Sequence, residues 1–135
     1  PRDAMRVMHQ MASALQAGET LAVFPEGTTS DGHTLLPFHA NLLQGAISTT
    51  TPVQPIALRY CDASHEISPA VRFLEETMSQ SLWSVACAQG LTVRVQVLPA
   101  QSVAHADRRR LAARLRDEIE SALAIPVDSQ ALPRP

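Results

Sequence analysis

Lysine is absent from this chain, and all eleven of its basic residues are arginine. Thirteen acidic residues leave a formal net charge of −2, so the basic excess that nucleic-acid-binding domains usually carry is missing. The composition therefore argues against a nucleic-acid partner. We interpret the exclusive use of arginine as the mark of a GC-rich genome more than of function, although the planar guanidinium group does suit phosphate recognition because it donates several hydrogen bonds in a fixed fork.

Cysteine and metal-ligand patterns are sparse as well. The two cysteines, Cys61 and Cys87, form no C-x-x-C pair, and we interpret them as buried or half-buried thiols rather than as a disulfide or a metal site. The five histidines show no ligand spacing, so no metal is expected. So few cysteines are typical of a protein that faces the reducing cytoplasm.

Long apolar runs are also missing. No stretch approaches the roughly eighteen apolar residues that a membrane-spanning helix needs, and no signal peptide opens the chain. The length of 135 residues, 45% of them hydrophobic, fits a single domain with a real core. The chain starts at Pro1 without an initiating methionine, and we interpret that start as a boundary inside a longer protein.

Helical and extended patterns alternate along the chain, which is typical of an α/β layer structure. Gly18 stands where a helix C-cap glycine belongs, and the run 20–24 is nearly all apolar, as in a buried strand of a parallel sheet. In the run 91–97 apolar residues alternate with polar ones, which predicts a strand with one buried face. The expected elements are helices over 3–17, 39–49, 77–89 and 105–124, and strands over 20–24, 53–60 and 91–97.

Three further expectations concern single positions and the C-terminus. Pro55, inside the second predicted strand, indicates an edge position or a bulge. Trp83 lies on the apolar stripe of the predicted helix 77–89 and is expected in the core. Residues 126–135 are rich in proline, and we expect them to form a disordered tail.

The chemically informative segment is the loop that follows the first predicted strand. It begins Pro25-Glu26-Gly27-Thr28-Thr29, and a serine then adds a third hydroxyl group. A glycine lets the backbone approach a ligand closely, and backbone amides together with hydroxyl groups can hold a phosphate without any lysine. Ligands of open α/β sheets bind at the carboxyl ends of strands, which is where this turn falls. A plain polar turn explains the same residues equally well.

The run Phe24-Pro25-Glu26-Gly27-Thr28 resembles the Phe-Pro-Glu-Gly-Thr block of the glycerophospholipid acyltransferases, the family of the lysophosphatidic acid (1-acylglycerol-3-phosphate) acyltransferases. The surroundings that also resemble the family are Leu15-x-x-Gly18 before the run, Leu36-Pro37-Phe38 after it, and the proline-bearing apolar strand 53–58. The order and spacing agree over about residues 3–60 and more loosely to about residue 123.

The resemblance implies that the hydroxyl group of a lysophosphatidic acid-like acceptor attacks an acyl thioester of acyl-carrier protein or coenzyme A, without a cofactor. It implies that Pro25, Glu26, Gly27, Thr28 and Thr29 bind the phosphate-bearing acceptor, with Glu26 holding an upstream arginine or fixing the turn. The implied fold is α/β, with a partly parallel sheet flanked by helices, as a fragment of the glycerol-phosphate acyltransferase fold. The implied location is the membrane surface, on the cytoplasmic face of the bacterial inner membrane.

Two features depart from the family's pattern. The arginine that usually follows Gly-Thr is replaced by Thr29, which removes one phosphate-binding cation. No histidine is followed by an aspartate after four intervening residues, so the family's catalytic His-x-x-x-x-Asp is absent. We therefore expect residues 1–125 to be the C-terminal part of a single acyltransferase domain. The isolated chain should be inactive because it lacks the general base.

Two rival functions stay open. One is a non-catalytic module that binds phospholipid headgroups, which an upstream His-x-x-x-x-Asp would exclude. The other is a nucleotide-binding α/β domain, which is disfavoured because neither G-x-G-x-x-G nor a Walker loop is present. His39 could line the acceptor site, although a helix-start histidine is the simpler interpretation. The arginine run 108–110 is interpreted as a solvated helix face, with a contact to anionic lipid as the alternative.

Overall fold

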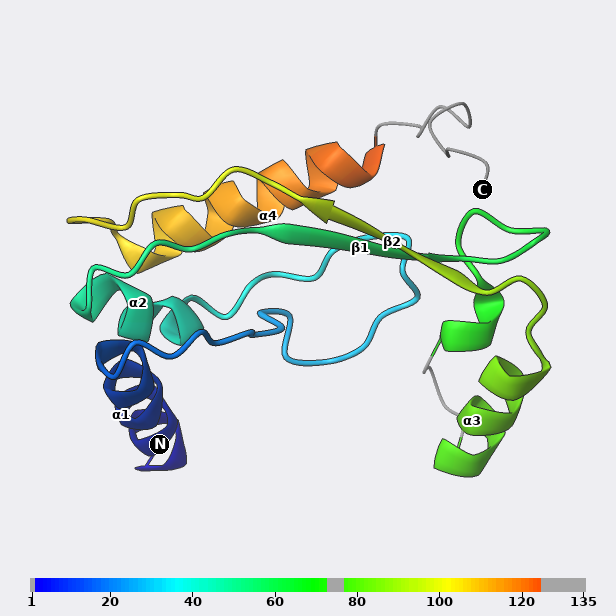
Figure 1. Ribbon diagram of the computed structural model, residues 1–135, viewed down its shortest axis with the longest axis horizontal. Helices are drawn as coiled ribbons and strands as arrows, with labels where there is room; N and C mark the ends of the chain where they lie inside the picture. Colours follow the sequence, from blue (N-terminus) through cyan, green and yellow to red (C-terminus); the bar gives the residue numbers. More distant parts are fainter. Residues whose placement is uncertain (1, 73–76, 125–135) are drawn as a thin grey trace.

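The computed structural model of the protein describes residues 2–72 and 77–124, so the predicted tail at 126–135 lies outside the described residues. The elements in chain order are helix α1 (Arg2–Gln16), 3-10 helix η1 (Ala40–Leu43), helix α2 (Gln44–Ser48), strand β1 (Ile56–Cys61), 3-10 helix η2 (Pro69–Val71), helix α3 (Met78–Cys87), strand β2 (Thr92–Val97) and helix α4 (Arg108–Ala124). The architecture is mixed α/β, as predicted. Helix α4 packs along the strands, and α1 and α3 extend from opposite ends of the molecule (Figure 1).

Helix α1 ends where its glycine was expected to end it. The Glu19 amide donates to the Ala14 carbonyl at 3.0 Å, and the Gly18 amide donates to the Leu15 carbonyl at 3.1 Å. Gly18 has a φ of +83°, which glycine adopts without the steric cost that a Cβ would bring. These two bonds form a Schellman motif and confirm the predicted cap.

Helix α4 carries a large part of the buried core. It begins after the predicted position 105, because the Asp107 carboxylate accepts from the amides of Arg109 and Arg110 at 3.1 and 2.9 Å and so caps the helix. The predicted apolar stripe of this helix is confirmed at Leu111 and Leu115. The buried cluster consists of Leu43, Val103, Leu111, Ala112 and Leu115, which joins α4 to η1 and to the chain that precedes α4.

Strands β1 and β2 pair antiparallel, with Ile56 opposite Val97 and Cys61 opposite Thr92. They are the only strands of the sheet in residues 2–72 and 77–124. Pro55 directly precedes β1, and its carbonyl accepts from the Leu98 amide at 3.0 Å. A proline has no N–H to donate to a ladder, which explains why β1 begins later than predicted, after Pro55.

The parallel pairing that the sequence predicted is not found in the described part of the chain. The run 20–24 has no ladder with β1, and Leu21, Val23 and Phe24 are 36%, 40% and 77% exposed. A parallel strand needs a hydrogen-bonded neighbour and cover on both faces. The apolar composition of this run indicates burial, but the described residues supply neither the neighbour nor the cover.

One face of the two-stranded sheet is apolar and uncovered by the described chain. Its residues are Ile56, Leu58, Tyr60, Val93, Val95 and Val97, each between 36% and 58% exposed. The opposite face, with Ala57 and Cys61 buried, lies toward α4, and Arg59 donates from it to the Leu123 carbonyl. The prediction that strand 91–97 buries its apolar side is therefore wrong for this structure, since every residue of β2 is exposed and α4 packs on the opposite face of the sheet, against β1.

Helix α3 also departs from its prediction. It starts as expected, with a capping box between Thr77 and Gln80. However, Trp83 is 72% exposed and Leu82 is 69% exposed, so the apolar stripe expected in the core faces away from the described chain. Cys87 is exposed too, whereas Cys61 is buried as expected. Among the described helices, none combines the length and the apolar character needed to cross a membrane.

Candidate functional site

The motif that follows the run 20–24 forms a tight turn. The Gly27 amide donates to the Phe24 carbonyl at 3.2 Å, which closes a β-turn with Pro25 at its second position. Gly27 has a φ of +69°, whereas Glu26 has no positive φ. Proline at the second position and glycine at the fourth are typical of a type I turn. The turn therefore requires its glycine for conformational reasons.

Two hydrogen bonds close the base of the loop that follows this turn. Glu26 Oε2 accepts from the Leu36 amide at 2.8 Å, and the His39 amide donates to the Pro25 carbonyl at 2.8 Å. Residues 26–36 thus form a compact surface loop whose two ends are joined. Of the two roles that the family resemblance left open for Glu26, its contact with Leu36 corresponds to fixing the turn.

The imidazole ring of His39 lies against the backbone of Gly27. A Cβ atom at position 27 would lie 2.8 Å from His39 Cδ2 and 3.0 Å from His39 Nε2, closer than carbon and nitrogen atoms normally pack. His39 is the N-cap residue of η1 and is exposed. It is therefore a helix-start histidine, as the simpler interpretation held, and it also stands beside the candidate site.

Gly27→Ala should displace His39, whereas Gly18→Ala should not. Both positions have a positive φ, so each alanine should cost about 1–2 kcal/mol of stability. A Cβ at position 18 has nothing within 4 Å, so only the Gly27 variant meets the ring. Thermal unfolding should show similar losses for both variants, and NMR should show a changed His39 ring environment in Gly27→Ala alone. An unchanged ring signal in that variant would contradict the packing of Gly27 on His39.

Two arginines from distant parts of the chain hold the outer part of the loop. Arg72 Nη2 lies 2.9 Å from His33 Nε2. Arg116, on α4, donates from Nε and Nη2 to the Leu35 carbonyl at 3.2 and 2.7 Å. The sequence analysis missed both contacts because the partners stand 39 and 81 positions apart, beyond the reach of any local pattern. The loop is therefore tied to the helix that carries the core.

A second polar cluster closes the loop after β1. Asp62 Oδ1 accepts from the amides of Ser64 and His65 at 2.8 Å each, and it lies 2.9 Å from His65 Nδ1. Hydrogen bonds from the Ser68 hydroxyl, the Ser64 amide and His65 hold the pKa of Asp62 well below its usual range. These partners all lie within six residues of Asp62, so the cluster stabilises a local loop.

Acid should open this loop. Because the folded pKa of Asp62 is depressed, its stabilising contribution is complete above the ordinary aspartate pKa of about 3.9 and is lost as the pH falls below it toward the folded value. We expect hydrogen-exchange protection at Ser64 and His65 to decrease in that range. Asp62→Ala, which has no side-chain acceptor, should lack this protection already at neutral pH, while Asp31→Ala, in another loop, should leave it unchanged. Protection that persists in Asp62→Ala would contradict this account.

Within residues 2–72 and 77–124, no group of three or more histidine, cysteine, aspartate or glutamate side chains is placed to hold a metal ion.

Thr28 is exposed, and neither its amide nor its hydroxyl group has a partner in the described part of the chain. Free donors at this turn can bind an oxyanion such as a phosphate group.

Comparison with known proteins gives consistent matches. An acyltransferase family model matches residues 1–59. The chain is 31% identical over 122 residues to a 1-acyl-sn-glycerol-3-phosphate acyltransferase of Neisseria meningitidis serogroup B, a match that covers 90% of this chain and 47% of that protein. It is also 38% identical over 58 residues to a lyso-ornithine lipid O-acyltransferase of Pseudomonas aeruginosa, covering 43% of this chain and 22% of that protein. The chain spans about half the length of the first of these relatives, and no solved structure matches it.

Proposed function

Because this chain belongs to the glycerophospholipid acyltransferase family, we propose that it supplies the acceptor-binding part of an enzyme that acylates a lysophospholipid. The proposed acceptor is lysophosphatidic acid or a close relative, and the donor is an acyl thioester of coenzyme A or acyl-carrier protein. The observation that carries the proposal is the turn at Phe24–Gly27, which is closed by its own hydrogen bond, with free donors on the next residue.

The turn suits a phosphate-bearing acceptor for two physical reasons. Gly27 has no side chain, so the His39 ring packs against its backbone at the open end of the turn, and the next residue, Thr28, offers an amide and a hydroxyl group as donors. Hydrogen bonds to a charged group contribute roughly 1.5–3 kcal/mol each. The Leu36 amide holds the Glu26 carboxylate at the base of the loop, where it fixes the turn. Thr29 completes the set of residues that we assign to acceptor binding.

The acyl transfer itself needs a general base. In the proposed reaction the acceptor hydroxyl group loses a proton to a histidine while its oxygen attacks the thioester carbonyl, and the thiol leaves. No histidine of this chain stands in His-x-x-x-x-Asp spacing. We therefore assign the base to a part of the enzyme outside these 135 residues and expect the turn to position the acceptor.

The exposed apolar surfaces support the idea that more of the domain packs on this chain. Monomeric soluble proteins rarely expose large contiguous apolar patches. Here, the apolar sheet face and the run 20–24 are both exposed. We propose that the remainder of an acyltransferase domain covers them and that the run 20–24 joins a partly parallel sheet there. Since its lipid acceptor resides in a membrane, we place the enzyme at the cytoplasmic face of the bacterial inner membrane.

A second acceptor class is favoured by two observations. The match to the lyso-ornithine lipid O-acyltransferase has 38% identity, although it covers fewer residues than the match to the glycerophosphate enzyme. Position 29 is threonine, where the glycerophospholipid family usually has arginine. A site with one cation fewer has less need of a phosphate on its acceptor. Lyso-ornithine lipid is therefore the second candidate acceptor.

A chimeric enzyme tests the proposal. The 122 matched residues of the Neisseria meningitidis protein are replaced by those of this chain. We expect the chimera to transfer an acyl group from acyl-coenzyme A to lysophosphatidic acid, and the 135-residue chain alone to transfer none. Lyso-ornithine lipid in a parallel assay separates the two acceptor classes. A folded chimera that binds lysophosphatidic acid without acylating either acceptor would support the non-catalytic headgroup-binding module instead.

A further inference from the structure

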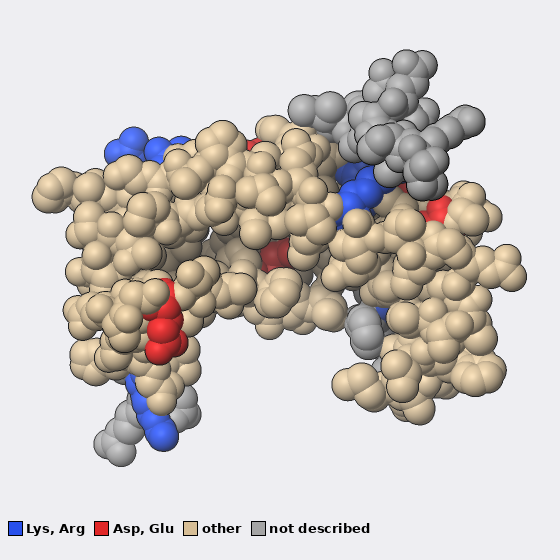
Figure 2. Space-filling view, in the orientation of Figure 1, with Lys and Arg blue, Asp and Glu red and all other residues tan. Residues whose placement is uncertain are grey.

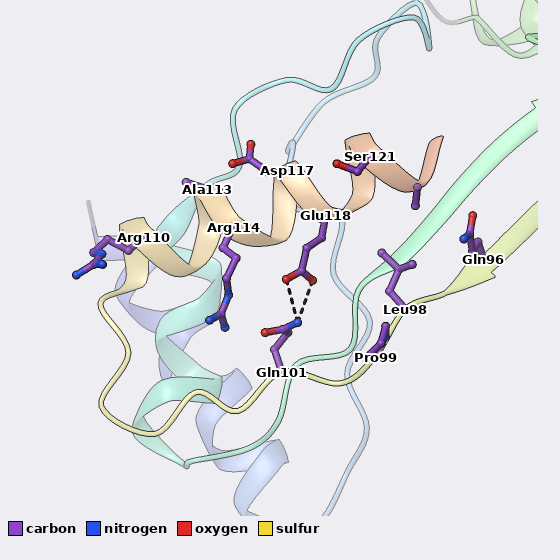
Figure 3. A pocket seen from close by; sticks show the side chains of 11 residues that line it. Gln96, Leu98, Pro99, Gln101, Arg110, Ala113, Arg114, Asp117, Glu118 and Ser121 are labelled. Carbon is purple, nitrogen blue, oxygen red and sulfur yellow. Dashed lines mark hydrogen bonds between the residues drawn. The ribbon is translucent and has the colours of Figure 1, made fainter. Parts of the chain in front are cut away.

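A groove of about 810 Å³ runs between helix α4 and the chain that follows β2. Its volume falls in the range of about 300–1,000 Å³ that is typical of small-molecule sites. Leu98, Pro99, Ala113 and Ala122 contribute its apolar lining. Figure 3 shows Arg110 and Arg114 toward one end of the groove, whereas Leu98 and Pro99 lie toward the other. The arginines and the apolar residues therefore lie in different parts of the groove, with Glu118 and Gln101 between them.

The acidic and basic side chains that line the groove differ in whether they have hydrogen-bond or ion-pair partners. Both carboxylate oxygens of Glu118 accept from Gln101 Nε2, at 3.0 and 2.9 Å, and Asp117 lies 3.8 Å from Arg116 Nη1. The guanidinium groups of Arg110 and Arg114 have no hydrogen-bond or ion-pair partner in the described part of the chain. Two unpaired cations thus lie at one end of the groove, and the negative charge of Glu118, which the uncharged Gln101 amide does not neutralise, lies farther along it.

We propose that this groove binds a single-chain anionic amphiphile. The negative head would lie between Arg110 and Arg114, and the alkyl chain would lie along Ala113, Leu98 and Pro99. Charge complementarity favours this occupant, because two free guanidinium groups attract an anionic head and offer it several donors. A purely polar ligand, such as a free nucleotide or inorganic phosphate, would leave the apolar lining of the groove without contacts.

This site is distinct from the turn that we assign to acceptor binding. None of the residues that line the groove belongs to the loop at 25–36. The sequence analysis interpreted the arginine run at 108–110 as a solvated helix face, and the structure places only Arg110 of this run in the groove. Failure of the groove proposal would leave the acyltransferase proposal standing, because the two rest on different residues.

Calorimetric titration of the 135-residue chain with dodecyl phosphate, below the concentration at which it forms micelles, tests the proposal. Dodecanoate and a lysophosphatidic acid of the same chain length distinguish a fatty acid from a lysophospholipid as the source of the anionic head. Decyl phosphate should bind roughly four- to fifteenfold more weakly than dodecyl phosphate, because each buried methylene contributes up to about 0.8 kcal/mol. Inorganic phosphate has the anionic head without the alkyl chain, and dodecyl maltoside has the alkyl chain without the charge. Each should bind at least about tenfold more weakly than dodecyl phosphate.

Three variants connect the binding to the groove. Arg110→Gln combined with Arg114→Gln should weaken dodecyl phosphate binding by about tenfold or more, since two charge-assisted contacts are lost. Arg109→Gln removes a neighbouring arginine that does not line the groove and should change the affinity little. Ala113→Trp, at an exposed position, should fill the groove and abolish binding.

Several results would overturn the proposal. Equal binding of inorganic phosphate and dodecyl phosphate would reduce the site to a simple anion site. Unchanged affinity in Ala113→Trp would place the amphiphile elsewhere. Binding to anionic phosphatidylglycerol vesicles without any binding of the monomeric amphiphile would identify a membrane-surface contact in place of a groove.

Discussion

Gly27→Leu in the active chimera is expected to lower kcat/KM for the lysophospholipid acceptor by roughly 10–150-fold, which corresponds to the loss of about 1.5–3 kcal/mol of contact with a charged group. A leucine at this position would distort the turn that presents the Thr28 donors to the acceptor. Its Cβ would also meet the His39 ring at 2.8 Å, and its φ of +69° would be strained. The KM for the acyl donor should stay near its original value, because the turn is assigned to the acceptor alone.

Gly18→Leu is the matched control for this experiment. Position 18 has a φ of +83°, but a Cβ there meets nothing within 4 Å. This variant should therefore carry similar backbone strain without the loss of acceptor use. A Gly27→Leu enzyme with a raised donor KM and unchanged acceptor kinetics would show that the assigned role is wrong. Glu26→Ala should act in the same direction as Gly27→Leu, and Glu26→Gln less so, since an amide oxygen can still accept from the Leu36 amide.

Leu115→Ala is expected to destabilise the chain by about 2–5 kcal/mol, because it removes buried methyl groups and leaves a cavity in the core. Leu115 is 4% exposed and belongs to the cluster that joins α4 to η1. Domains are stable by only about 5–15 kcal/mol, so a loss of this size should lower the midpoint of urea denaturation markedly.

Leu82→Ala provides the same chemical change at an exposed site. Leu82 lies on α3 and is 69% exposed, so its truncation should change stability by less than about 0.5 kcal/mol. A Leu82→Ala protein as destabilised as the Leu115→Ala protein would mean that the face of α3 is covered in solution. That result would contradict the location of the core along α4.

The local parts of the fold were predictable from the sequence, because short-range signals determine them. Gly18 ends α1, the Thr77 capping box starts α3, and the leucine stripe of α4 faces the core. The direction of strand pairing was not predictable in the same way. It depends on which strands are available as neighbours, and in the described chain β1 pairs with β2 alone. The predicted burial of the apolar runs was wrong for a related reason. An apolar pattern indicates which side of an element is suited to burial, but not whether another part of the chain packs on it.

The candidate site shows the same division. The sequence located the turn at residues 25–29, and its glycine has the positive φ that such a turn needs. Contacts between distant segments were beyond the reach of a local pattern: His39 beside Gly27, Arg72 beside His33, and Arg116 on the Leu35 carbonyl. These contacts depend on tertiary packing, which places α4 and the C-terminal end of η2 against the loop.

The distribution of charged side chains over the surface cannot be predicted from composition alone. Most of the face shown in Figure 2 carries neither positive nor negative side chains, and the charged ones are scattered at its periphery and in its hollows. A net charge of −2 is compatible with many such distributions. On this face, therefore, an anionic ligand meets no broad basic surface.

The central claim is that the turn at Phe24–Gly27, with the donors of Thr28, receives the phosphate of the acceptor. An NMR titration of the chain with glycerol 3-phosphate tests it most directly. The account predicts saturable shifts of the Gly27, Thr28 and Thr29 amide signals, and their loss in Gly27→Leu but not in Gly18→Leu. The binding of a charged headgroup by a few donors should be weak, with a Kd on the order of 1 mM. Shifts confined to Arg110 and Arg114, or saturable binding that Gly27→Leu leaves unchanged, would contradict the assignment of this turn.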